Sequence, residues 1–255
     1  MRLVNFVKTN PIATSLLLVA VASGFFLLFP GVDIALSDLF YSQRRGFWLK
    51  RNDFLGLFRR SNDILNTIVV VVLLGSLAVK LARPDKPSPI RPSVVVYLIS
   101  TALLGPVLIV NVILKAYWGR PRPVQIEMFG GDAPYVEVWR ITDWCEQNCS
   151  FVAGEGAAAM WLVIVAMALP RPYRVPATLL TLVYVFLVSF NRIAFGGHFL
   201  SDVVIAFALT VLSAAVMHRI VIEQPPKWLT NEALEAGLTE FGRSLRGRRA
   251  GAGAR

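Results

Sequence analysis

Residues 94–123 read VVVYLISTALLGPVLIVNVILKAYWGRPRP, an apolar run that ends in a group of cations. A helix needs about 20 apolar residues to cross the roughly 30 Å hydrocarbon core of a bilayer, and residues 94–114 supply them. The whole chain has this character, since 55% of its 255 residues are hydrophobic and only 16% are charged. This composition excludes an ordinary soluble domain and predicts an all-α, polytopic membrane protein.

Similar apolar runs recur along the chain. The fourth run contains Gly154, Glu155 and Gly156, and the fifth is short, so these two are less regular than the others. Together the runs predict six transmembrane helices. Their expected ranges are residues 12–30, 64–82, 94–114, 151–169, 175–190 and 199–222.

The basic residues predict the orientation. By the positive-inside rule, basic termini and basic even-numbered connections place both termini in the cytoplasm. The connection 31–62 is also basic, although this topology places it outside; an amphipathic segment in the outer interface and plain surface solvation both explain it. The residues that set the orientation are Arg2, Lys8, Lys80, Arg83, Lys86, Arg91, Arg171, Arg174, Arg219 and the arginines of residues 243–255.

The two ends of the chain raise separate questions. Residues 20–22 read AVA and resemble a signal-peptidase site, but the apolar run continues to Phe29, so an uncleaved anchor helix is preferred. Two prolines at positions 225 and 226 end the membrane part. We therefore expect a six-span domain over residues 1–225 and a cytoplasmic basic tail over residues 226–255, helical at first and then flexible.

Polar groups that suit phosphoryl transfer follow the third and fifth apolar runs. Lys115 and Arg122 lie in the stretch quoted above, and residues 191–202 read NRIAFGGHFLSD, which brings Arg192, His198 and Asp202. In the predicted topology all five side chains lie on the outer face. Three cations can hold a phosphate, and a neutral imidazole can attack it. Asp202, one helical turn after His198, can hold the ring.

These residues resemble two of the three motifs of the type-2 phosphatidic acid phosphatase superfamily. The first motif is Lys115 with Arg122 and its following proline, and the second is Arg192 with His198 and Asp202. The resemblance implies an all-helical membrane fold and metal-independent cleavage of a phosphate ester through a phosphohistidine. It implies that His198 is the nucleophile, that Asp202 orients it, and that Lys115, Arg122 and Arg192 bind the phosphate oxygens.

The middle motif departs from the family pattern. The family usually reads Ser-Phe-Pro-Ser-Gly-His, whereas residues 150–155 read SFVAGE, so Gly154 is kept and Glu155 replaces the histidine that protonates the leaving oxygen. Gly154 still lets the backbone approach a phosphate. A glutamate acts as general acid only if its pKa rises from about 4.3. We prefer a catalytic Glu155, and a binding-only site or transfer to an acceptor other than water stay open.

Cys145 and Cys149 lie in the loop before the fourth predicted span. On the outer side of a bacterial inner membrane the setting is oxidising, so this pair can form a disulfide that braces the approach to Glu155. No second Cys or His pair accompanies them, and both histidines lie elsewhere. We therefore expect neither a metal site nor a cofactor.

The sequence thus predicts a multi-pass phosphatase of the bacterial inner membrane, with its active site facing the periplasm. The substrate would be a phospholipid or glycolipid phosphate at the outer leaflet. Lipid A is preferred, and polyprenyl pyrophosphate and phosphatidylglycerol phosphate or phosphatidic acid remain alternatives. The alternative from another functional class is a non-catalytic membrane protein that binds or moves phospholipids. Beyond the bilayer and this lipid, no nucleic acid and no obligate protein partner is expected.

Overall fold

The computed structural model describes residues 9–252, with side chains through residue 246. This part of the chain is mostly helical, as predicted, and its one sheet is an antiparallel pair of two-residue strands. Arg2 and Lys8, which contributed to the predicted orientation, lie outside the described residues. The α-helices are α2 (Pro11–Leu28), α3 (Gly31–Asp38), α4 (Asp53–Ala82), α5 (Pro92–Ala102), α6 (Lys115–Tyr117), α7 (Gly154–Met167), α8 (Arg171–Ala194), α9 (Leu200–His218) and α10 (Asn231–Ala252).

Short elements complete the fold. The strands β1 (Tyr41–Ser42) and β2 (Gly46–Phe47) form a hairpin between α3 and α4. Two π-helical stretches continue longer helices, η2 (Leu103–Leu114) after α5 and η5 (Arg219–Glu223) after α9. The remaining turns are 3₁₀-helical: η1 (Trp48–Arg51), η3 (Pro123–Gln125), η4 (Glu127–Phe129) and η6 (Lys227–Leu229).

Five of the helices are long and apolar enough to cross a bilayer. The fourth predicted span, residues 151–169, is instead represented by α7, which has 14 residues and is shorter than a usual span. Its place in the bundle accounts for the difference, because α7 packs against α4, α5, η2, α8 and α9. The five long spans are Pro11–Leu28, Asp53–Ala82, Pro92–Tyr117, Arg171–Ala194 and Leu200–Glu223.

Small side chains allow this close packing. Helix α7 begins with glycines and alanines that are almost fully buried, so that neighbouring backbones approach closely. At Gly105 in η2, an added Cβ would lie 3.0 Å from the hydroxyl oxygen of Ser213 on α9. Pro106 follows, and the helix there is π-helical.

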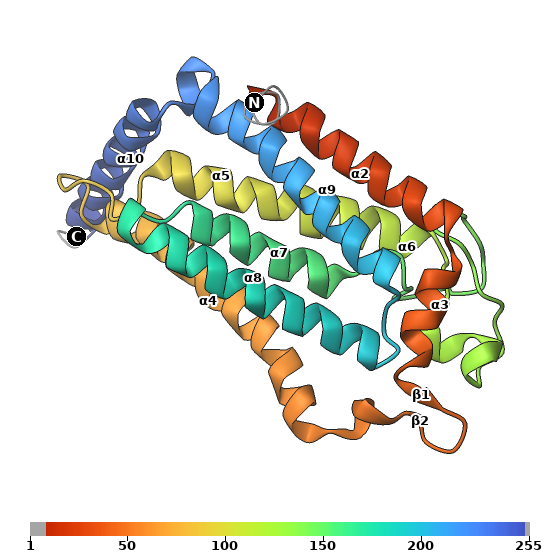
Figure 1. Cartoon of the computed structure of the whole chain (residues 1–255). Helices are drawn as coiled ribbons and strands as arrows, with labels where there is room; N and C mark the ends of the chain where they lie inside the picture. Colours follow the sequence, from red (N-terminus) through yellow and green to blue (C-terminus); the bar gives the residue numbers. More distant parts are fainter. Residues whose placement is uncertain (1–8, 253–255) are drawn as a thin grey trace.

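The bundle has two distinct ends (Figure 1). Helix α3, the β1–β2 hairpin and the loop after α6 gather at one end, whereas α10 and the beginning of α2 lie at the other. Helix α10 is held there by α4, because Lys80 Nζ lies 2.8 Å from Glu235 Oε1. The helix expected after residue 230 is present as α10 and extends to Ala252. Most of the tail predicted to be flexible, residues 246–255, has no described side chains.

Candidate active site

The turn between α8 and α9 carries three of the predicted site residues. Arg192 lies in the last turn of α8, His198 follows in the connecting turn, and Asp202 lies in the first turn of α9. Two glycines make this turn feasible. Gly196 has a φ of +64°, and a Cβ at Gly197 would collide with the guanidinium of Arg192. The backbone between Arg192 and His198 thus packs closely against the guanidinium of Arg192.

His198 is buried and makes one clear hydrogen bond, from Nδ1 to the carbonyl oxygen of Ser150 at 2.8 Å. A carbonyl only accepts, so Nδ1 carries the proton and the lone pair of the neutral ring is on Nε2. Burial is the main cause that lowers the pKa of His198 to about 4; Arg192 and Arg122 act in the same direction, and Asp202 opposes them. The imidazole is therefore neutral at neutral pH, as a nucleophile must be.

The spacing predicted a direct contact between Asp202 and the imidazole of His198, but Asp202 makes no hydrogen bond to the ring. Its Oδ2 lies 3.8 Å from Nδ1 of His198, beyond hydrogen-bond distance. The carboxylate instead accepts hydrogen bonds from Arg120 Nη1 at 2.6 Å, from the Ser150 hydroxyl and from the backbone N–H of Phe199. Ser150 therefore joins the two residues, since its carbonyl holds His198 and its hydroxyl donates to Asp202.

Arg120 is a part of the site that the motif reading did not select. Its guanidinium is fully buried between two carboxylates, with Nη2 at 2.9 Å from Asp33 Oδ2 and Nη1 bound to Asp202. It also lies over the ring of Phe199, 4.5 Å from the centroid. Arg120 precedes Arg122 in the same Gly-Arg-Pro-Arg-Pro run, but the spacing of the family motif assigns only Arg122 to phosphate binding. The sequence did offer one signal for Asp33, because an acidic residue directly after an apolar run can mark a functional position.

The three predicted phosphate-binding cations come together at this end. Arg122 is half-buried, and its Nε and Nη2 donate to the carbonyl of Asn148 at 3.0 and 2.7 Å. Arg192 is buried, and its Nε has no hydrogen-bond partner among the described residues. Lys115 is half-buried in α6, within electrostatic range of both arginines and of Glu155. Cations with unfilled donor capacity suit an anionic ligand.

Glu155, in the first turn of α7, is held by two arginines. Arg59 of α4 binds it in a fork, with Nε at 3.0 Å from both carboxylate oxygens and Nη2 at 2.6 Å from Oε1. Arg192 Nε lies 3.3 Å from Oε2. Both guanidiniums favour the ionised carboxylate. Arg59 was not selected from the sequence, although it belongs to the connection whose cations did not fit the positive-inside pattern.

Gly154 begins α7 and is buried. The first N–H groups of a helix have no acceptor within that helix, so this end can bind an anion. The glycine is needed for space as well, because a Cβ there would lie 2.6 Å from Asn111 Oδ1. Glycine thus keeps Asn111 of η2 close to the beginning of α7.

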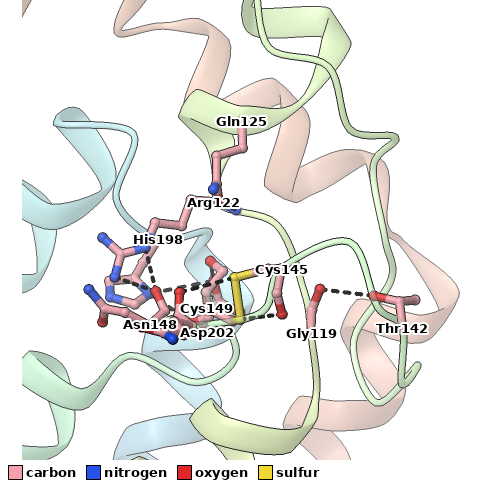
Figure 2. The surroundings of a disulfide bond; sticks show 11 residues. Gly119, Arg122, Gln125, Thr142, Cys145, Asn148, Cys149, His198 and Asp202 are labelled. Carbon is pink, nitrogen blue, oxygen red and sulfur yellow. Dashed lines mark hydrogen bonds and ion pairs between the residues drawn. A yellow bond between two sulfur atoms is a disulfide. The ribbon is translucent and has the colours of Figure 1, made fainter.

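Cys145 and Cys149 form a disulfide, with a Cα–Cα distance of 5.7 Å (Figure 2). Asn148 lies between them with a φ of +52° and presents its carbonyl to Arg122. The expected brace near Glu155 is thus, more directly, a brace for Arg122. Among the described residues, no group of three or more His, Cys, Asp or Glu side chains could hold a metal ion.

A pocket of about 280 Å³ opens beside the turn between α8 and α9. Gly197, the neighbour of His198, lines it together with five cationic side chains and no acidic one. Its volume is near the lower limit for small-molecule sites. The lining residues are Lys50, Gly56, Arg59, Arg60, Arg122, Val124, Arg192, Phe195, Gly196 and Gly197.

Comparison with known proteins agrees with the motifs. Residues 93–225 match the PAP2 superfamily. The chain is 34% identical over 201 residues to a protein named lipid A 4'-phosphatase from Francisella tularensis subsp. novicida, covering 76% of this chain and 88% of that one. It is 32% identical over 205 residues to a lipid A 4'-phosphatase of Rhizobium leguminosarum, covering 75% and 88%, respectively. A third of that name, from Rhizobium etli, is 33% identical over 205 residues, covering 75% and 80%. No solved structure matches the chain.

Proposed function

The chain belongs to the PAP2 superfamily, and from this we propose that it is a membrane phosphatase that hydrolyses a phosphate ester of lipid A. The three relatives carry that activity in their names, and they align with most of this chain. The observation that carries the proposal is a neutral His198, held through Nδ1 by Ser150, next to a pocket lined by Arg122 and Arg192.

In the proposed reaction, Nε2 of His198 attacks the phosphorus and the P–O bond to the lipid breaks. The phosphoryl group passes to the imidazole, and water then hydrolyses the phosphohistidine to release phosphate. Lys115, Arg122 and Arg192 stabilise the charge on the phosphoryl oxygens in the transition state. Asp202 positions the ring through Ser150 and stabilises the positive charge that develops on it.

The leaving lipid oxygen needs a proton, and we assign this role to Glu155. In the free site the carboxylate is ionised and paired with Arg59 and Arg192. A bound phosphate competes with Glu155 for Arg192 and brings negative charge next to the carboxylate. Both effects favour uptake of a proton, which Glu155 then donates to the leaving oxygen.

We further propose six spans in the bacterial inner membrane, with α7 as a short span enclosed by longer helices. Both termini would be cytoplasmic and the site would face the periplasm. The separation of the catalytic end from α10 and the beginning of α2 supports this orientation, because the two groups occupy opposite ends of the bundle (Figure 1). The phosphate would be held by side-chain cations without a metal.

Release of inorganic phosphate by the purified protein tests the proposal. The substrates are lipid A, polyprenyl pyrophosphate and phosphatidic acid in mixed micelles, with and without EDTA. We expect the highest kcat/KM for lipid A, no effect of EDTA, and a loss on the order of 10³-fold or more for His198→Ala. Lipid binding without phosphate release would instead support a non-catalytic protein. Activity that EDTA abolishes and magnesium restores would rule out the phosphohistidine reaction.

A further inference from the structure

The basic segment 48–60, which comprises η1 and the beginning of α4, is built onto the catalytic end although it lies outside the region that matches the family. Asn62 Nδ2, just after the segment, donates to the carbonyl of Glu155 at 3.1 Å. Asn191 of α8 donates to the carbonyl of Leu55 at 2.9 Å. The aromatic ring of Phe58 packs against Tyr184 of α8, with centroids 5.6 Å apart. These contacts fix the segment beside the phosphate site.

Three cations of this segment, Lys50, Arg59 and Arg60, line the same pocket as Arg122 and Arg192. Five positive charges therefore face one cavity of about 280 Å³. Glu155 offsets one of them through its pairs with Arg59 and Arg192, and Asp63, further along α4, acts electrostatically on the same two arginines. The positive charge left is about three or more. A phosphate monoester carries only about −1.5 to −2 at pH 7, so a single phosphate does not balance the pocket.

The same segment exposes large apolar side chains next to its cations. Trp48, Phe54 and Leu57 are 45%, 73% and 64% exposed. Aromatic and aliphatic side chains alternating with cations are typical of a segment in the membrane interface. A ligand that reaches the pocket past this surface is therefore an amphiphile with its anionic groups at the level of the headgroups.

We infer that Lys50 and Arg60, with Arg59 between them and Glu155, form a second anion subsite that binds another acidic group of the same lipid molecule. The inference rests on the proposed function and extends it: the preferred substrate carries at least two anionic groups, one cleaved at His198 and one held by Lys50, Arg59 and Arg60. Arg59 is shared, because its fork holds Glu155 while it also lines the pocket.

The test compares lipid A that carries two phosphates with lipid A that carries only the phosphate to be cleaved. The variant is Lys50→Gln with Arg60→Gln, and the matched control is Arg45→Gln with Arg51→Gln, two nearby cations that do not line the pocket. For the two-phosphate lipid we expect the first variant to raise KM about tenfold, the loss of two charge-assisted contacts, with a smaller change in kcat. For the one-phosphate lipid the rise in KM should be several-fold smaller, and the control should shift KM for both lipids equally and weakly.

The subsite would be overturned if the Lys50 and Arg60 variant raised KM equally for both lipids. It would also be overturned if the control variant changed KM for the two lipids as the Lys50 and Arg60 variant does. Both results indicate general attraction to anionic micelles. Binding of the two lipids to His198→Ala protein gives a second measurement that needs no turnover. Suppose that the unaltered protein releases no phosphate, but the His198→Ala protein binds the two-phosphate lipid about tenfold more tightly than the one-phosphate lipid. The proposed function then fails and the subsite stands. If hydrolysis proceeds but this preference is absent in binding and in KM, the function stands and the subsite fails.

Discussion

His198 is held by a backbone carbonyl, and this partner decides which ring nitrogen would react in the proposed mechanism. The carbonyl of Ser150 fixes the proton on Nδ1, and Nε2 keeps its lone pair. Asp202 is itself fixed by Arg120, which in turn pairs with Asp33 of α3. Removing one partner of a buried ion pair commonly costs about 3–5 kcal/mol. The proposed nucleophile, His198, thus depends on a chain of buried contacts that begins outside the family motifs.

The lowered pKa of His198 predicts how activity depends on pH. Because the pKa of the folded protein is about 4, the neutral ring persists as pH falls through 6.5, and is lost only near pH 4. After correction for ionisation of the substrate, protonation of His198 should therefore cause no fall in kcat/KM for lipid A above about pH 5. The measurement is kcat/KM from pH 4 to 8 in the detergent-solubilised protein. A fall centred near 6.5 would mean that the imidazole is solvated in the free enzyme.

Glu155→Gln tests the proton donor. Glutamine keeps the shape of the side chain but cannot donate a proton to the leaving oxygen, so kcat for lipid A should fall on the order of 10²–10⁴-fold. The loss should be much smaller for a nitrophenyl phosphate, whose leaving group needs little protonation. Asp63→Asn, which neutralises a nearby carboxylate of α4, is the matched control and should change both rates equally and weakly. Equal losses on the two substrates for Glu155→Gln would leave Glu155 only as an ion-pair partner of Arg59 and Arg192.

At the scale of the elements, the loop between α6 and α7 positions one cation of the site. The disulfide closes residues 145–149, and the carbonyl of Asn148 inside this ring accepts two hydrogen bonds from Arg122. The sequence allowed prediction of the bridge because two cysteines share an outer loop. It did not allow prediction of the contact with Arg122, since that depends on how the loop folds back over residues 120–123.

Replacing both cysteines by serine should therefore weaken phosphate binding. A hydrogen bond to a charged group contributes about 1.5–3 kcal/mol, so kcat/KM should fall about tenfold or more while the protein stays folded. In the background of Arg122→Gln the same replacement should have little further effect, because the contact is already lost. Dithiothreitol should reproduce the loss in the unaltered protein only. A full additional loss in the Arg122→Gln background would show that the loop acts on another part of the site.

Helix α7 shows where sequence reasoning reached its limit for the elements. The long apolar runs predicted five long helices correctly, because a lipid-facing helix must be apolar along its length. The fourth run gave a helix of only 14 residues, since residues 151–153 enter the site as irregular chain. Enclosure by neighbouring helices is a tertiary property. Hydropathy along the chain does not reveal it.

For the whole molecule, the motifs selected the central residues of the candidate site but not their surroundings. Lys115, Arg122, Arg192 and His198 were found from their spacing, and the fold brings them to one end of the bundle. Arg59 and Asp33 come from segments outside residues 93–225, where no motif applies. Their roles depend on α3 and α4 packing against the core. A sequence pattern cannot express such contacts over long separations.

The opposite end of the bundle should affect stability far more than catalysis. Deleting residues 231–255 removes α10, which lies at the end of the bundle opposite α3 and the β1–β2 hairpin (Figure 1). The deletion also removes Glu235, the carboxylate that pairs with Lys80, a side chain only 3% exposed. We expect kcat for lipid A to stay within a few-fold, because no group of the site comes from this helix, and the melting temperature in detergent to fall. Glu235→Gln, which keeps the helix and removes the charge, should lower the melting temperature by a smaller amount. A large fall in kcat of the still-folded deletion variant would mean that α10 is coupled to the catalytic end, and the assignment of catalysis to the opposite end of the bundle would be wrong.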